Sequence, residues 1–122
     1  MERERFQELV AEAVDGLPSE LRESIHNVAI LVADWPTQEQ LGQVGIGHRS
    51  DLLGLYEGIP LPNRGSGYNM VLPDKITIFQ KPIEMRYRSE EKIINKIQRT
   101  VRHEIAHYFG ISDARLRDIG RY

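Results

Sequence analysis

The chain has 122 residues, of which 40% are hydrophobic and 28% charged, and this composition predicts one globular domain over residues 1–122 with a single modest core. Its formal net charge of −2 excludes the strongly basic overall field by which many proteins bind nucleic acid. Because the chain has no cysteine, disulfides and thiolate zinc sites are also excluded, and a bound metal would depend on histidine, carboxylate and water.

The first element that we expect is an amphipathic helix. The start, Met-Glu-Arg-Glu-Arg-Phe, is charged and unlike a signal peptide, and no apolar run reaches the length of a membrane span, so we expect a cytoplasmic protein. Apolar side chains recur at helical spacing until Asp15-Gly16 and Pro18, which are typical of a helix end. We interpret the stripe as core rather than as a partner-binding face; it consists of Phe6, Leu9, Val10, Ala13, Val14 and Leu17.

Two strands are expected in the next part of the chain. Residues 28–32 form a continuous apolar run, which predicts a buried strand. Residues 42–47 are rich in glycine and loop-like, but they lack the lysine and the strand-to-helix context of a phosphate-binding loop. Residues 52–59 predict a second strand, interrupted by Gly54 and Gly58.

A long connection leads to the third strand. Residues 60–74 are rich in proline, glycine and asparagine, as in loops that carry function or move. Residues 75–80 alternate between apolar and polar side chains, which predicts a half-buried strand. Pro82 limits the continuation of this strand and favours an edge position in the sheet.

A long helix is predicted over residues 89–109. Ser89 is a suitable N-cap, and Glu90 and Glu91 complement the helix dipole in the first turn. The face that we expect to pack on the sheet consists of Ile93, Ile94, Ile97, Val101 and Ile105. The region also has a basic stretch, which we interpret as a solvated helix face rather than a phosphate-binding patch; it consists of Arg86, Arg88, Lys92, Lys96, Arg99 and Arg102.

The end of this helix has the motif H-E-x-x-H, in which His103 and His107 are four residues apart. On a helix both imidazoles lie on one face, away from the apolar stripe, and can reach the same ion. Glu104 lies to the side of this pair, where it can face a water on the metal. The spacing therefore predicts two metal ligands and a general base.

A third ligand is expected after the helix. Gly110 supplies a helix stop, and the following turn can bring Asp113 back towards the metal. Asp118 is a rival, but it lies farther from that turn, and residues 113–119 could form a final turn or short helix. Three protein ligands would leave the fourth position of a zinc ion open, as in catalytic rather than structural sites.

The motif and its extension, H-E-x-x-H-x-x-G-x-x-D, resemble the zincin metallopeptidases, and in particular the metzincin-like branch, in which the third ligand follows the glycine. Over nearly its full length the chain resembles the small bacterial minimal zincin family. The segments that carry this resemblance include Asn-Val-Ala-Ile-Leu-Val, Leu-Leu-Gly-Leu-Tyr-Glu-Gly and Leu-Pro-Asp-Lys-Ile-Thr-Ile-Phe. The resemblance implies a zincin-like fold and a zinc metallopeptidase of unknown substrate.

The chain departs from the larger zincins in three respects. No methionine follows Asp113, so a Met-turn under the metal is absent, and the third ligand is aspartate rather than the commoner histidine. At this length we expect no second lobe to wall a deep cleft. The substrate groove should therefore be shallow, or completed by a protein partner.

Together, these patterns predict an α+β fold in which a small mixed or antiparallel sheet packs on the N-terminal helix and on the metal-bearing helix. We expect a zinc-dependent hydrolase, above all a peptidase, in which His103, His107 and Asp113 bind Zn²⁺ and Glu104 is the general base. One alternative is a non-catalytic zincin-fold module that binds a metal or a partner. A weaker alternative is a nucleic-acid-associated protein that uses the basic stretch, and steeply salt-dependent binding would favour it.

Several other residues could contribute to a site. His26 and His48 are not at ligand spacing, so we expect them to be solvated or satisfied by hydrogen bonds. Trp35 should be partly buried at a strand end, and Glu57 is either a site carboxylate or a solvated strand residue. Tyr108 lies beside the apolar stripe, which favours packing. The sequence does not choose which tyrosine would stabilise an oxyanion among Tyr56, Tyr68, Tyr87 and Tyr108.

Overall fold

The computed structural model describes residues 1–25, 27–58 and 74–111. Its helices are α1 (Arg3–Asp15), α2 (Ser19–Glu23), α3 (Gln38–Val44), α4 (Gln80–Arg86) and α5 (Glu90–Tyr108), with a short 3₁₀ helix, η1 (Arg49–Asp51). Its strands are β1 (Val28–Ala33), β2 (Gly54–Glu57) and β3 (Asp74–Phe79). None of the helices described in these ranges is both long and apolar enough to cross a membrane.

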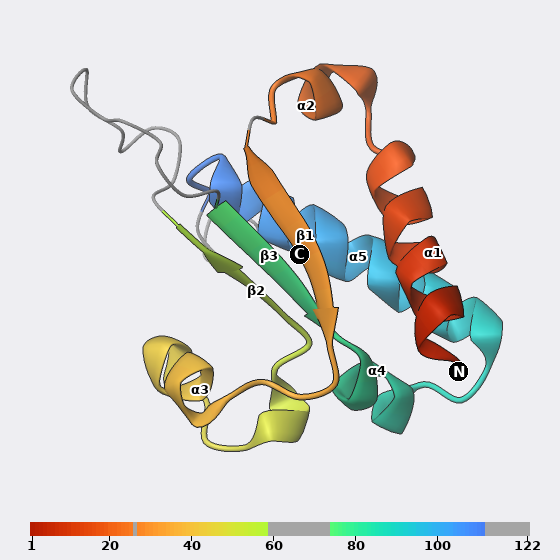
Figure 1. The fold of residues 1–122 in the computed structure, drawn as a ribbon, viewed down its shortest axis with the longest axis vertical. Helices are drawn as coiled ribbons and strands as arrows, with labels where there is room; N and C mark the ends of the chain where they lie inside the picture. The colour runs from red at the N-terminus through yellow and green to blue at the C-terminus, as the bar shows by residue number, and fades with distance from the viewer. Residues whose placement is uncertain (26, 59–73, 112–122) are drawn as a thin grey trace.

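Within the described ranges the strands form one mixed sheet in the order β1-β3-β2 (Figure 1). β1 runs parallel to β3, with Ile30 opposite Ile76, and β2 runs antiparallel to β3, with Gly54 opposite Ile78. A parallel pair needs a long crossover between its strands, and here the crossover includes α3 and β2. The expected α+β fold with a small mixed sheet is therefore confirmed.

Two expectations about the strands are wrong. β3 is the central strand rather than a half-buried edge strand, and its Ile76, Ile78 and Phe79 are 0% exposed. Pro82 does not mark an edge, because the chain turns into α4 at Gln80 and Pro82 falls in the first helical turn, where a missing N–H costs little. Among the described strands β1 and β2 are the edges instead, and Leu31 of β1 is 44% exposed.

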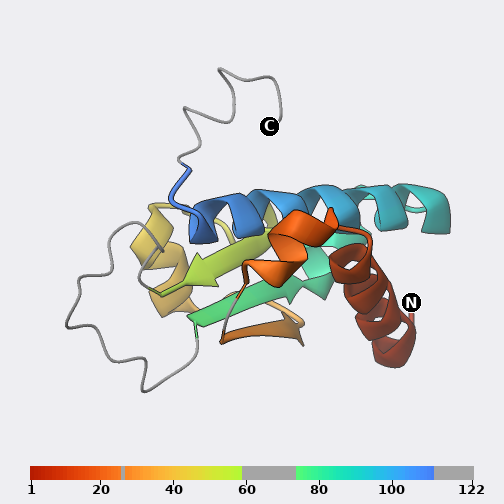
Figure 2. The same cartoon turned by 90° about the horizontal axis from the view of Figure 1, so that it is seen from above.

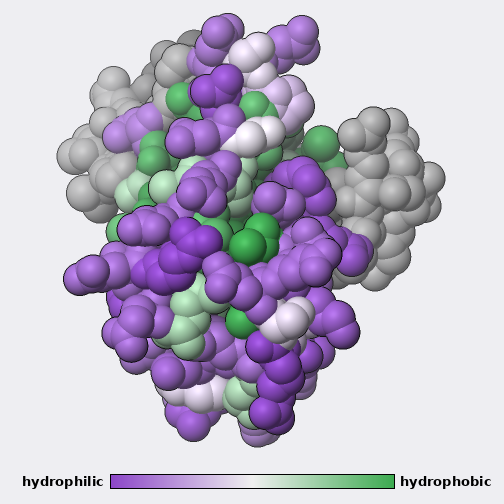
Figure 3. All heavy atoms as spheres, turned by 90° about the vertical axis from the view of Figure 1, so that its right-hand side faces the viewer, coloured by the Kyte–Doolittle hydropathy of each residue, from purple (hydrophilic) through white to green (hydrophobic). Residues whose placement is uncertain are grey.

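The main core lies between the sheet and the two long helices, and Figure 2 shows α5 extended across one face of the sheet with α1 beside it. As expected, the apolar stripe of α1 is core. The buried residues of this cluster are Phe6, Leu9, Val10, Ala13, Leu17, Ile76, Ile78, Ile83, Ile93, Ile97, Val101 and Ile105. The outer surface on the α1 side is mostly hydrophilic with scattered apolar side chains (Figure 3), as expected for a helix with one buried face.

A second, smaller cluster consists of Leu41, Leu52, Leu55 and Phe79. Because side chains alternate along a strand, Phe79 points to the face of β3 opposite to Ile76 and Ile78. This cluster therefore covers part of the far face of the sheet and contributes to the burial of β3 on both sides.

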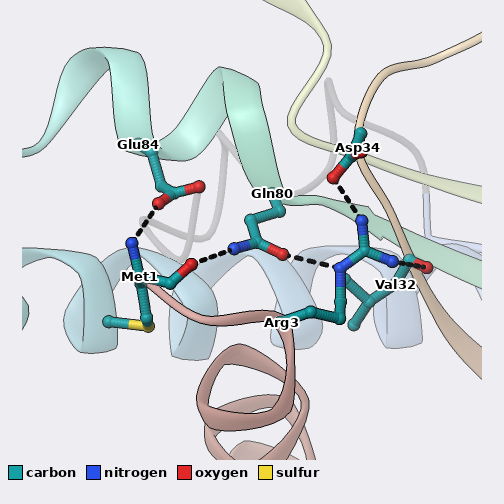
Figure 4. Close-up of polar contacts among 6 residues, drawn as sticks. All are labelled: Met1, Arg3, Val32, Asp34, Gln80 and Glu84. Atoms are coloured by element: carbon teal, nitrogen blue, oxygen red, sulfur yellow. Dashed lines mark hydrogen bonds and ion pairs between the residues drawn. The ribbon is translucent and has the colours of Figure 1, made fainter.

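Polar contacts fix the start of α1 against α4 and the end of β1 (Figure 4). The amino group of Met1 lies 2.8 Å from Glu84 Oε2, and Gln80 Nε2 donates to the Met1 carbonyl at 2.8 Å. Arg3 donates from Nε to Gln80 Oε1 at 2.8 Å and pairs with Asp34 beyond β1. These bonds set the orientation of α1 and hence the position of its apolar face under α5.

The helix α3 was not expected, because residues 42–47 have the glycine content of a loop. Its start is fixed by a capping box: Thr37 Oγ1 accepts from Gln40 N at 3.1 Å, and Gln40 Oε1 accepts from Thr37 N at 2.9 Å. The helix ends at Gly45, whose φ of 69° lies in the left-handed region. Only the residues after Val44 are therefore the predicted loop, and α2, η1 and α4 are further short helices that the sequence patterns missed.

Candidate metal centre

The helix α5 confirms the prediction over residues 89–109 closely. Ser89 Oγ accepts from Lys92 N at 3.2 Å, as an N-cap should. At the other end, Ile111 N donates to Ala106 O and Gly110 N donates to His107 O, both at 2.9 Å. With a φ of 80° at Gly110, these bonds form a Schellman motif. The predicted glycine stop is thus confirmed, immediately after the two histidines.

His103 and His107 lie together on the partly exposed side of α5. Their ring centroids are 4.6 Å apart, and their side chains are 22% and 28% exposed. The ligand atoms of His103, Glu104 and His107 all lie within 4.8 Å of one another. Two imidazoles and a carboxylate are a donor set that suits zinc, so these residues fit the metal that the motif predicts.

Glu104 is buried between α5 and the sheet, with only 6% of its side chain exposed. A buried carboxylate needs hydrogen-bond donors, and Tyr56 N donates to Glu104 Oε1 at 2.9 Å from the neighbouring strand β2. Oε1 lies 3.6 Å from His107 Nδ1, and Oε2 lies 3.8 Å from His103 Nε2. The carboxylate is therefore held between the two histidines by a backbone amide that the sequence motif does not contain.

The strand β2 also orients this amide through the side chain of Tyr56. The Tyr56 hydroxyl donates to Asp74 Oδ2 at 2.8 Å, and its ring meets that of Tyr108 edge to face at 6.1 Å between centroids. Tyr108 is 0% exposed, which confirms the packing role expected for it. Neither the Tyr56 amide nor Asp74 could be found from residue type and spacing, because they are 48 and 30 positions from Glu104 in the chain.

Other candidate residues have different partners. His48 Nδ1 accepts from Ser50 N at 3.1 Å, which confirms that it is a satisfied histidine. Trp35 is partly buried, as expected, and the Arg49 guanidinium lies 4.0 Å from its ring centroid. Glu57 is half-buried and accepts from Gln40 Nε2 at 3.0 Å.

Several predicted site residues lie outside the described residues. These are Asp113, the expected third ligand, its rival Asp118, and also His26 and Tyr68. The assignment of Asp113 therefore stays a prediction.

A cleft of about 400 Å³ opens beside the histidine pair. One wall is β2 with the residues before it, and the other is the last three turns of α5. Both histidines and Glu104 line it, and so do three basic side chains of α5, which are Lys96, Arg99 and Arg102. In the described part of the chain, the candidate metal ligands therefore form part of the wall of this cleft.

Gly54 lets β2 approach α5 closely at this cleft. A Cβ atom there would lie 2.6 Å from Thr100 Cγ2 and 3.3 Å from Glu104 Cγ. The sequence marked Gly54 only as an interruption of a strand. In the structure its missing side chain is the reason that the Tyr56 amide can reach Glu104.

We expect Gly54→Ala to lower the free energy of unfolding by about 1–3 kcal/mol, because the added methyl group overpacks this contact. Urea denaturation with zinc absent measures the change. The matched control is Gly42→Ala in α3, where a Cβ meets nothing within 4 Å and an alanine should stabilise the helix by about 0.5–1 kcal/mol. Equal unfolding midpoints for Gly54→Ala and the native chain would contradict the close approach.

The sequence was compared with known protein families and with curated proteins. Residues 25–121 match the family described as zincin-like metallopeptidase, a range that contains the whole sheet, α5 and the H-E-x-x-H motif. A search among curated proteins gave no match. Because the family match covers well over half of the sequence, and the two histidines and Glu104 converge as the motif predicts, the chain belongs to the zincin-like metallopeptidase family.

Proposed function

We propose that the protein is a zinc-dependent peptidase, in which His103 and His107 bind the metal and Glu104 transfers the proton. The observation that supports this most is the convergence of the three side chains within 4.8 Å, at the wall of an accessible cleft. The family match supports a metal-dependent peptidase in general. Zinc as the metal, Asp113 as third ligand and a cytoplasmic location remain part of the proposal.

Zinc bound by these residues would lower the pKa of a water molecule and polarise the carbonyl of the scissile bond. The work of the protein is then to place a proton acceptor beside that water. Glu104 Oε1 is held by the Tyr56 amide, which leaves the carboxylate fixed in one orientation. We propose that Oε2 accepts the proton of the attacking water and that the carboxyl group passes it to the leaving amine.

The roles of Glu104 and Asp113 are separate in this proposal. Glu104 lies as close to the two histidines as a third metal ligand would. Its hydrogen bond from Tyr56 N on β2 holds the carboxylate in place, however, and this favours the role of general base over that of ligand. Asp113 would complete the ligand set after the Gly110 stop. An open fourth position would then remain for water and substrate.

The function is tested with the full-length protein loaded with zinc. We expect about one zinc ion per chain by native mass spectrometry, and cleavage of a defined peptide library detected by liquid chromatography and mass spectrometry. Cleavage should stop with 1,10-phenanthroline, persist with the non-chelating 1,7-isomer, and return when zinc is restored. Stoichiometric zinc without any cleavage would instead support a non-catalytic metal-binding module.

A further inference from the structure

We propose that the cleft beside His103 and His107 selects acidic peptide segments, which it binds through Lys96, Arg99 and Arg102. The inference rests on the proposed function for the cleavage of such peptides, but not for their binding. It concerns the only wall of the described cleft that has several side chains of one charge.

The three basic residues line the cleft at a defined distance from the metal ligands. Lys96, Arg99 and His103 are spaced by three and four residues, so they lie on one face of α5. At 1.5 Å per residue, Arg99 lies about 6 Å and Lys96 about 10 Å from His103 along the helix axis. An extended peptide covers about 3.3 Å per residue. Carboxylates within about two to three residues of the scissile bond would therefore meet these cations.

The positive charges of this wall lie close to one another. Burial lowers the pKa of Lys96, and the neighbouring charges of Arg99 and Arg86 lower it further. In the described part of the chain, neither Lys96 nor Arg102 has a carboxylate partner at ion-pair distance. Arg86 differs, because it pairs with Asp51 at 2.6 Å and so does not belong to the binding wall. An anionic ligand would reduce the repulsion that Lys96 experiences from its positive neighbours.

An acidic peptide fits this wall better than a nucleic acid does. The cations are confined to one side of a cleft of about 400 Å³. The opposite wall includes the apolar Leu52, Leu53 and Leu55, together with Asp51, whose carboxylate pairs with Arg86. A nucleic acid would instead require cations spread along a surface that follows its backbone. A short segment with both apolar and acidic side chains matches both walls.

The test compares three fluorescein-labelled dodecapeptides in which alanine alternates with glutamate, glutamine or lysine. Binding to the zinc-loaded protein is measured by fluorescence anisotropy at low salt, and mass spectrometry verifies that each probe is intact. We expect the glutamate peptide to bind about tenfold more tightly than the glutamine peptide, because three partly exposed ion pairs each contribute a factor of about two to three. The lysine peptide should bind most weakly.

The triple variant Lys96→Gln, Arg99→Gln and Arg102→Gln should bind the glutamate peptide no better than the glutamine peptide. The matched control removes three positive charges outside the cleft, at Lys81, Arg88 and Lys92, and should change the affinity less than about twofold. The single variant Arg102→Gln changes an exposed side chain and can be measured even if the triple variant unfolds. It should weaken the affinity for the glutamate peptide by a factor of about two to three.

Three outcomes would overturn the inference. They are equal affinity for the glutamate and glutamine peptides, equal losses in the triple variant and its control, and tighter binding of a single-stranded DNA of equal charge that the triple variant abolishes. The last would identify a nucleic-acid site. If the protein prefers the glutamate peptide but cleaves no peptide, the proposed peptidase function fails and this inference stands. If it cleaves peptides without a preference for charge, the proposed function stands and this inference fails.

Discussion

Glu104→Gln is expected to lower the rate of peptide hydrolysis by about 10²–10⁴-fold while zinc stays bound. Glutamine has the shape of glutamate, and its amide oxygen can still accept the Tyr56 N–H that now bonds Oε1 at 2.9 Å. The contact between α5 and β2 should therefore survive. A neutral amide cannot accept a proton from water, so the change removes the proposed base without removing a ligand.

The measurement combines the rate on a peptide identified from the library with the zinc content of the same sample. A suitable control is Glu57→Gln, because Glu57 is a half-buried carboxylate on the same strand as Tyr56 but is bonded to Gln40 and does not line the cleft. It should keep the native rate. A Glu104→Gln protein that turns over at the native rate would show that another group is the base.

The sequence was most informative where the structure is determined by local contacts. The N-cap at Ser89, the apolar stripe of α5 and the Gly110 stop all depend on residues within a few positions of one another. The pairing of His103 with His107 depends on the same helical period. For this reason the helix and the histidine pair could be predicted from a single sequence.

The sheet was harder to predict, because strand position depends on partners far along the chain. Residues 28–32 have the apolar run of a buried strand and residues 75–80 the alternation of a half-buried one. Among the described strands, however, β1 lies at an edge and β3 at the centre. Thr77 is 5% exposed although it is a polar residue of the alternating pattern, and Phe79 on the same face of β3 packs with Leu41, Leu52 and Leu55. The local sequence pattern does not show this packing, because the partners come from other parts of the chain.

The hydrogen bond that holds Glu104 in place also could not be predicted from the sequence. Its hydrogen bond comes from the main chain of Tyr56, and every residue except proline has such an amide. Gly54 was noticed, but only as a strand breaker. In the structure, a Cβ atom at position 54 would lie only 2.6 Å from Thr100 Cγ2, so a residue with a side chain does not fit there without a shift.

Removing any one of the three proposed zinc ligands, His103, His107 or Asp113, is expected to weaken zinc binding by at least about a hundredfold. This exceeds the 10–100-fold typical of residues that only support a ligand, because the loss leaves two protein donors. The His103→Ala and His107→Ala proteins should stay folded, since both side chains are partly exposed and lie away from the buried stripe of α5. Zinc titration gives the affinity, and circular dichroism with and without chelator gives the fold. Global unfolding on chelation would indicate a structural metal instead.

Matched variants separate the assigned ligands from their rivals. His48→Ala should keep zinc, because His48 caps η1 through Ser50 and lies outside the cleft. Asp118→Ala should bind zinc far more tightly than Asp113→Ala, because Asp113 is the first carboxylate after the Gly110 stop. Asp113→His should retain zinc, since imidazole is also a good zinc ligand. If Asp118→Ala is the damaging change, the third ligand is Asp118, and the histidine pair with Glu104 is unaffected by that reassignment.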